Sequence, residues 1–503
     1  MKSLAHRILF LNTFAFTICF AAWMLNGVLV TYLVENQIVD WGPVEIGWLM
    51  GIPVLTGSLM RLPVGILSDR YGGKPVFSIL LILSAIPMLL LSQMTEFLGF
   101  ALCSVGFGLT GASFAVGVAY TSVWYPKKQQ GTVLGIFGVG NAGAAITTLL
   151  APALLNHLTL NGTDKEAWRI LPMIYGVVLA VVALIFFVFA VNKKPENSQR
   201  SLRTSLKPLK NIRVWRFGLY YFLVFGCFVA FAQWLVPYFL NVYYLPLVTA
   251  GIFASLFSFP SGVIRALGGW LSDKFGARKV MYGVLGASSI ISLLLVVPKM
   301  DIYSPGKGIL ASTGGTVSHV SDSLIAIGEK SYVLTQKANG LAEADKTAKI
   351  LPVKEVWQEP VIREGEQVKK KQLIAKGVTH IFYQANVWGF AVLVILIGSV
   401  WGVGKAAVYK HIPDYFPNEV GVVGGMVGVM GGLGGFFCPI VFGYLLEFTG
   451  VWSSCWLFMF FLSILSLLWM HQVVLKMKNK DSIEKYHKLE EMPELAGATT
   501  FEG

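Results

Sequence analysis

Apolar runs long enough to cross a bilayer recur along this chain and leave few folds open to it. A transmembrane helix needs about 20 mostly apolar residues, and the run FLNTFAFTICFAAWMLNGVLVTYLV meets that length. Only 13% of the residues are charged, against about 25% in a soluble domain. The length criterion predicts an all-α integral membrane protein with about twelve transmembrane helices. The predicted spans are residues 9–33, 45–67, 75–93, 97–124, 131–156, 168–191, 215–241, 248–271, 279–298, 384–409, 420–446 and 451–475.

The formal charge of +13 reports membrane topology and does not indicate a nucleic-acid partner. Lysine and arginine gather in alternate loops, for example Arg70 with Lys74 and Lys127 with Lys128, whereas the loops between them hold Glu35. Cytoplasmic loops carry such a cationic excess. We therefore expect an inner-membrane, multi-pass protein with both termini in the cytoplasm. The first apolar run is too long for a signal peptide and is taken as the first span.

Two stretches of the chain are near copies. RLPVGILSDRYGGKPV starts at Arg61, and RALGGWLSDKFGARKV starts at Arg265. A second pair, YPKKQQGTVLGIFGVGNAGAA and FPNEVGVVGGMVGVMGGLGG, shares an aromatic–Pro turn followed by closely spaced glycines. Such a repeat predicts two parallel six-helix halves, the arrangement of the major facilitator superfamily. The predicted parts are residues 1–192 and 214–298 with 384–475 for the halves, 193–213 for a cytoplasmic linker and 476–503 for a cytoplasmic tail.

Residues 299–383 interrupt the second half with a polar segment between the ninth and tenth spans. Apolar residues that alternate between glycine turns predict a small β-rich insertion outside the cytoplasm. Long inserted domains cross the membrane largely regardless of charge, so its lysines fit the topology. Its second half resembles the turn of biotinyl and lipoyl barrels, and Lys346 in ADKTA resembles a lipoyl attachment site. We favour a decorative or docking domain without attachment over a lipoylated one.

Several classes of activity have no support in the sequence. The five cysteines lie within predicted spans and form no CxxC motif or Cys/His cluster, so we expect no disulfide and no metal site. The sequence contains no nucleophile–base motif and no P-loop of the form GxxxxGK[ST]. We therefore expect no cofactor, no enzymatic activity and no use of ATP.

The copied stretches end in polar turns that match the superfamily's cytoplasmic signature between spans two and three and its echo between spans eight and nine. Aspartates in these turns can accept hydrogen bonds from helix ends or pair with cations, and the glycines permit a tight turn. We expect the turns to act in gating and not in substrate choice. The predicted gating residues are Asp69, Arg70, Gly72, Asp273, Lys274 and Gly276.

Arg61 and Arg265 each precede the aspartate of their turn by eight residues, or about 12 Å along a helix. A charge at that depth costs at least about 2.5–3.5 kcal/mol on insertion scales. The spans hold no Asp or Glu at comparable depth. A guanidinium presents paired donors that suit planar oxyanions. We expect the two arginines to meet at the pseudo-twofold axis and bind a small planar anion; snorkelling or helix packing is the alternative.

Glycines dominate spans five and eleven, and Asn141 stands among them in GVGNAG. Close packing of helices through small residues explains many of these glycines. An amide beside an exposed helix backbone also offers neutral donors to an anion. Asn141 is therefore a candidate binding residue, with an interhelical hydrogen bond as the alternative.

The paired arginines, GVGNAGAA and GGLGGFFCP together resemble the nitrate/nitrite porter (NarK-type) family of the major facilitator superfamily. The resemblance covers about residues 1–298 and 384–475. It implies transport of nitrate and nitrite, with the arginines holding the anion and aromatic residues of spans four and seven enclosing it. Carried over by position, the family's binding residues are Arg61, Arg265, Asn141, Phe114, Tyr221 and Phe225.

Lys405 lies in GVGKAAVYKHIP and precedes Pro417 by as many residues as Phe114 precedes Pro126. It is thus the counterpart of Phe114 in the second half. The segment resembles the branch of the family that works as nitrate/proton symporters. A buried lysine could couple protons to anion binding, so Lys405 is a candidate coupling residue.

The sequence thus predicts a monomeric secondary transporter of nitrate, and of nitrite, working by alternating access with proton symport. Nitrate/nitrite exchange, nitrite export and transport of formate or cyanate are the alternatives. A membrane sensor built on the same fold is a further one, but the segment after Lys476 is a short polar stretch and not a signalling domain.

Overall fold

The structure is a computed structural model that describes residues 2–194, 207–296, 299–337, 353–416 and 420–490. It divides into two compact units, Met1–Leu293 with Val394–Gly503, and Leu294–Leu393. The first unit is a helical bundle and the second holds the strands. Eleven described helical segments are long and apolar enough to cross a bilayer, or twelve if α13 and α14, bent by 43°, form one span. The all-α transmembrane prediction is confirmed.

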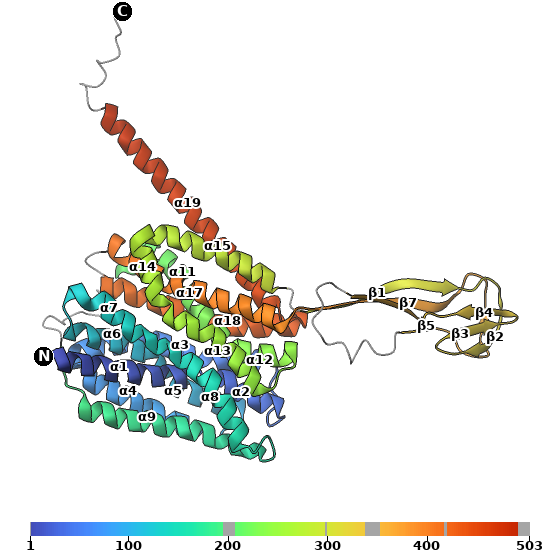
Figure 1. Cartoon of the computed structure of the whole chain (residues 1–503), viewed down its shortest axis with the longest axis horizontal. Coiled ribbons are helices and arrows are strands. Elements are labelled where there is room, and N and C mark those ends of the chain that lie inside the picture. Colours follow the sequence, from blue (N-terminus) through green and yellow to red (C-terminus); the bar gives the residue numbers. More distant parts are fainter. Residues whose placement is uncertain (1, 195–206, 297–298, 338–352, 417–419, 491–503) are drawn as a thin grey trace, which may run out of the picture. The chain divides into compact units, whose positions relative to one another are not determined.

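The first half of the bundle, blue to teal in Figure 1, consists of helices linked by short turns. Its elements are α1 (Lys2–Trp23), α2 (Asn26–Glu35), α3 (Pro43–Tyr71), α4 (Gly73–Leu91), α5 (Phe97–Phe107), η1 (Gly108–Ala112), α6 (Ser113–Trp124), α7 (Lys127–Gly138), η2 (Val139–Ala142), α8 (Gly143–Leu158), η3 (Lys165–Arg169) and α9 (Ile170–Phe189). Spans four and five each change to a tight 3₁₀ turn, η1 or η2, at glycines.

The second half repeats this plan, coloured green to red. Its elements are η4 (Lys207–Lys210), α11 (Ile212–Tyr221), η5 (Phe222–Cys227), α12 (Phe228–Tyr243), α13 (Leu247–Val263), α14 (Arg265–Phe275), α15 (Ala277–Leu295), α17 (Val387–Tyr415), α18 (Val420–Thr449) and α19 (Ser454–Glu490). Helices of the two halves pack directly on each other, most extensively α3 on α18 and α8 on α13. We call the end at which α3 and α14 stop the turn end.

Two details of the helices were not predicted. The first span is broken at Met24 and Leu25, between α1 and α2. α19 continues to Glu490, so the segment predicted as a tail from residue 476 begins as a helix. The stretch holds several lysines together with Glu484 and Glu490, and both residue types favour helix, so the helix does not stop where the apolar run ends. Residues 195–206 of the predicted linker and 491–503 of the predicted tail lie outside the described residues.

The two polar turns end α3 and α14 on glycines with positive φ, Gly72 at 95° and Gly276 at 85°. Glycine adopts this conformation without the steric cost of a Cβ. Each backbone N–H bonds to the carbonyl of the serine four residues earlier, Ser68 or Ser272. The repeat in sequence is therefore also a repeat in local structure.

The second unit is built on antiparallel strands, as alternation predicts. Strand order is β1-β7-β5 in one sheet and β4-β3-β2-β6 in the other. Its apolar core includes Val317, Ile325, Ile327 and Ile374. Lys346 lies outside the described residues. The strands are β1 (Lys299–Leu310), β2 (Gly315–Val320), β3 (Leu324–Ile327), β4 (Lys330–Val333), β5 (Val353–Pro360), β6 (Gln367–Val368) and β7 (Leu373–Gln384).

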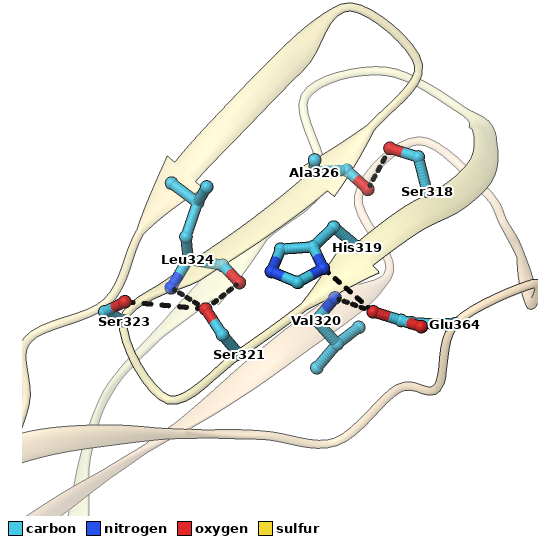
Figure 2. Close-up of polar contacts among 8 residues, drawn as sticks. All are labelled: Ser318, His319, Val320, Ser321, Ser323, Leu324, Ala326 and Glu364. Atoms are coloured by element: carbon cyan, nitrogen blue, oxygen red, sulfur yellow. Dashed lines mark hydrogen bonds and ion pairs between the residues drawn. The ribbon is translucent and has the colours of Figure 1, made fainter.

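Figure 2 shows Glu364 in contact with the end of β2, next to the β2–β3 hairpin. Its Oε1 accepts from the backbone N–H of Val320 at 2.9 Å and lies 3.0 Å from Nδ1 of His319. The hydrogen bond from Val320, followed by the charge and hydrogen bond of His319, lowers the pKa of Glu364 below its ordinary value. Because the folded pKa is depressed, this stabilisation is present above the unfolded pKa and disappears as pH falls through the folded pKa.

We therefore expect Glu364→Gln to speed amide exchange at Val320 near neutral pH, with the difference from wild type shrinking as the medium is acidified. Hydrogen exchange of the intact protein, compared at matched pH, measures this difference. A gap between the two proteins that stays constant from neutral to acidic pH contradicts the assignment.

Candidate functional site

Arg61 lies inside the bundle, on α3 between the two halves. Its side chain is 5% exposed. Nε donates to the carbonyl of Gly111 at 3.3 Å, and Nη1 donates to the carbonyl of Gly428 in α18 at 2.8 Å. The guanidinium carbon lies 5.5 Å from the ring centre of Phe114 and 5.2 Å from that of Phe225. A side chain placed in this way is not snorkelling.

Arg265 approaches the same place from the second half. It is the first residue of α14, just after the bend from α13. Its guanidinium carbon lies 6.0 Å from the ring centre of Phe114 and 5.7 Å from that of Tyr409. Its Nη1 is buried and has no hydrogen-bond partner among the described residues. One ring, Phe114, is thus shared by arginines from both halves.

The charge of the two arginines is not balanced by a carboxylate. Within the described segments, no ion pair involves Arg61 or Arg265. Aromatic faces carry negative potential and attract guanidinium groups, but they accept no strong hydrogen bond. A buried donor that lacks an acceptor costs about 1–3 kcal/mol or more. An oxyanion at this point would supply both the missing charge and the missing acceptors.

Aromatic side chains of spans seven and ten form one wall of the site. Tyr221 and Phe225 stack at 5.0 Å with planes 5° apart, and Tyr409 meets Tyr221 edge-on at 5.0 Å. Phe225 belongs to η5, a π-helical turn. Such turns re-aim side chains and are frequent at functional sites. Here the turn holds Phe225 against Arg61.

Lys405 adds a third cation beside this wall. The side chain is fully buried, and Nζ donates to Oγ of Ser261 at 2.9 Å. The ammonium lies 3.1 Å from the ring centre of Phe228 and 6.0 Å from that of Phe225. Lys405 and Arg61 therefore both face Phe225, so the predicted coupling residue and the predicted binding residues adjoin.

Asn141 is less directly connected. It lies in η2, is 2% exposed, and its Oδ1 has no partner in the described structure. The turn approaches the site through Gly138, where an added Cβ would lie 3.6 Å from Nη1 of Arg265. No hydrogen bond joins Asn141 to either arginine among the described residues. Its predicted role remains a prediction.

The predicted gating residues lie apart from this centre, at the turn end. Asp273 pairs with Lys410 at 2.5 Å, and Lys274 lies 4.9 Å from the ring centre of Trp270. In the first half, Arg70 lies 5.4 Å from the ring centre of Tyr71. These contacts are local to each half, and Asp69 belongs to the same turn as Gly72.

Three residues that contact Arg61 or Arg265 were not predicted from the sequence. Tyr409 stands one helical turn after Lys405, and that spacing could have revealed it. Trp23, whose ring centre lies 5.6 Å from the guanidinium carbon of Arg61, ends α1 and carries no sequence signal. Gly428 contributes a backbone carbonyl, which no side-chain pattern reports.

Comparison with known proteins decides the family. A family model described as "Major Facilitator Superfamily" matches residues 11–336 and 373–497. The probable nitrate/nitrite antiporter NarK1 of Thermus thermophilus is 38% identical over 482 residues, covering 95% of this chain and 93% of that protein. The chain belongs to the NarK-type nitrate/nitrite porter family of the major facilitator superfamily.

Two further proteins extend the comparison. The nitrite extrusion protein of Bacillus subtilis is 26% identical to this NarK-type porter over 451 residues, covering 89% of each chain. The crystal structure of a bacterial homologue of the human lysosomal transporter Spinster matches the fold with a TM-score of 0.62 at 14% identity, covering 94% of this chain and 97% of that one. The predicted fold and the absence of enzymatic function are thereby confirmed, because members of this superfamily are transporters.

Proposed function

We propose that this porter carries nitrate and nitrite across the inner membrane by alternating access, holding the anion between Arg61 and Arg265. The observation that carries the proposal is the pair of guanidinium groups, one from each half, that share the ring of Phe114 without a carboxylate partner in the described chain. The names of the relatives, a nitrate/nitrite antiporter and a nitrite extrusion protein, support this substrate class.

Tight contact between the halves at one end supports alternating access. At the end away from the turns, an added Cβ on Gly51 of α3 would lie 2.7 Å from the carbonyl of Phe436 in α18. On Gly251 of α13, it would lie 2.7 Å from Cγ of Pro152 in α8. Both pairs join one half to the other, so this end is closed.

Towards the turn end, three glycines lack such contacts. An added Cβ on Gly135, Gly269 or Gly425 would meet nothing within 4 Å among the described atoms. Gly269 stands one helical turn beyond Arg265, and Gly135 one turn before Gly138, which faces that arginine. We infer that these glycines pack together when the halves rock and the other end opens. If both termini lie in the cytoplasm, as we propose, the open turn end faces inward, and we propose that the carrier works as a monomer.

Transport in proteoliposomes tests this function. Nitrate uptake that requires nitrite inside the vesicle indicates exchange, and uptake that requires a proton gradient indicates symport. Competition by formate and cyanate measures selectivity. Failure of nitrate to move under either condition contradicts the proposal.

Lys405 favours symport, because a buried lysine can exchange a proton as its surroundings change. We expect Lys405→Met to abolish proton uptake that accompanies a nitrate pulse in vesicles, while nitrate still binds. The pH change inside the vesicle and nitrate binding to purified protein measure the two effects separately. Coupling that is unchanged in Lys405→Met removes this lysine from the mechanism and leaves nitrate/nitrite exchange as the better account.

A further inference from the structure

A proline in α3 leaves one backbone carbonyl of that helix without its usual donor, at the closed end of the bundle. Pro53 has no N–H and cannot bond to the carbonyl of Leu49. Asn26, in α2 of the same half, supplies the missing donor from Nδ2 at 2.6 Å. Asn26 is fully buried. This bond takes the place of the missing backbone hydrogen bond, and both of its partners belong to the first half.

The neighbouring carbonyl, that of Met50, also accepts a hydrogen bond from a side chain, and this one comes from the other half. Nε2 of Gln233, in α12, donates to it at 3.2 Å, and Gln233 is also fully buried. The backbones are close there, because an added Cβ on Gly27 of α2 would lie 2.7 Å from Cα of Gln233. The side-chain amides of Asn26 and Gln233, which come from different halves, thus donate to adjacent carbonyls of α3.

We propose that Gln233 is a positioning residue for the transport cycle, a latch that stabilises closure at the end away from the turns; this rests on the proposed alternating access. Its bond to Met50 crosses between the halves, so it exists only while that end is closed. The bond of Asn26 lies within one half and persists in both arrangements. The difference in position gives the two amides different roles despite their similar chemistry.

The latch is weak enough to release. Oε1 of Gln233 is buried without a partner among the described residues, and a buried acceptor without a donor is costly. Separation of the halves would admit water to that oxygen and offset part of the lost bond. Closure is therefore favoured without being locked.

Gln233→Met tests the latch, because it removes the donor and keeps a side chain of similar length. Nitroxide labels at Thr163→Cys and Tyr244→Cys report opening of this end, since the chain places them after α8 and after α12 and both positions are exposed. The native cysteines are all buried. We expect the population open at this end to rise about 2- to 10-fold in Gln233→Met, as for loss of one net hydrogen bond.

Asn26→Leu is the matched control and is expected to lower the melting temperature while leaving the two distance populations unchanged. The measurement uses no nitrate, so its outcome is independent of whether nitrate is the substrate. If Gln233→Met does not fold, Gly27→Ala tests the same contact, since its methyl group would separate α2 from α12 and raise the open population. Unchanged populations in the Gln233 or Gly27 variant, or an equal shift in Asn26→Leu, overturn the proposal.

Discussion

Arg61→Lys and Arg265→Lys are each expected to reduce nitrate transport by about 100-fold or more, although each keeps its positive charge. A lysine ammonium is a single compact donor group and cannot reproduce the planar fork that suits an oxyanion. Hydrogen bonds to charged groups contribute about 1.5–3 kcal/mol each, and the arginine also packs on aromatic faces. Initial rates of nitrate uptake into proteoliposomes, at matched protein content, measure the loss.

Arg169→Lys is the control for a general effect of the substitution. Arg169 lies at the surface of the bundle and pairs with Glu166 at 2.8 Å. Arg169 is half-buried and also donates from Nη1 to the carbonyl of Ser92 at 2.8 Å, but it is no part of the proposed site, so transport should remain close to that of wild type. Robust flux in Arg61→Lys or in Arg265→Lys would count heavily against an arginine clamp.

The second large effect concerns the two ends of the bundle. Gly251→Leu should hold the porter open at the end away from the turns, because its side chain meets the carbonyl of Thr148 and Pro152 in the opposite half. Gly135→Leu should hold it open at the turn end, because it fills the space into which the second half must close. Overpacking of this kind costs about 1–3 kcal/mol, or roughly a 5- to 150-fold shift between the two arrangements.

Both glycine variants should transport slowly, but their conformational populations should move in opposite directions. Distances between spin labels at each end, measured on purified protein, separate the two cases. Gly283→Leu is the control, because Gly283 on α15 also has nothing within 4 Å of an added Cβ and takes no part in the proposed gate. Shifts in the same direction, or full transport by Gly135→Leu, would contradict the rocking of two halves.

The fold could be read from the sequence because its determinants are local. Apolar length defines a span, and the copied stretches at Arg61 and Arg265 carry the repeat. Helix ends were harder to predict, since Lys and Glu continue α19 beyond the apolar run. The 3₁₀ turns η1 and η2 and the π turn η5 contain glycines and pack against neighbouring helices, which a length criterion does not detect.

The residues at the centre of the proposed site could be predicted from the sequence for a similar reason. A charge within a span and without a carboxylate partner is rare enough to single out Arg61, Arg265 and Lys405 as candidates. The residues that contact them could not be predicted in this way. Trp23 and the carbonyl of Gly428 reach Arg61 only through the packing of helices far apart in the chain. The interhalf bond of Gln233 depends on the same packing.

Equilibrium binding of isotopically labelled nitrate to the purified porter tests the central claim most directly. The account predicts one saturable site per chain that nitrite competes for and that disappears in Arg61→Ala and in Arg265→Ala alike, because each half supplies one guanidinium to one anion. Nitrate binding that survives either substitution with unchanged affinity, in protein that remains folded, would contradict it.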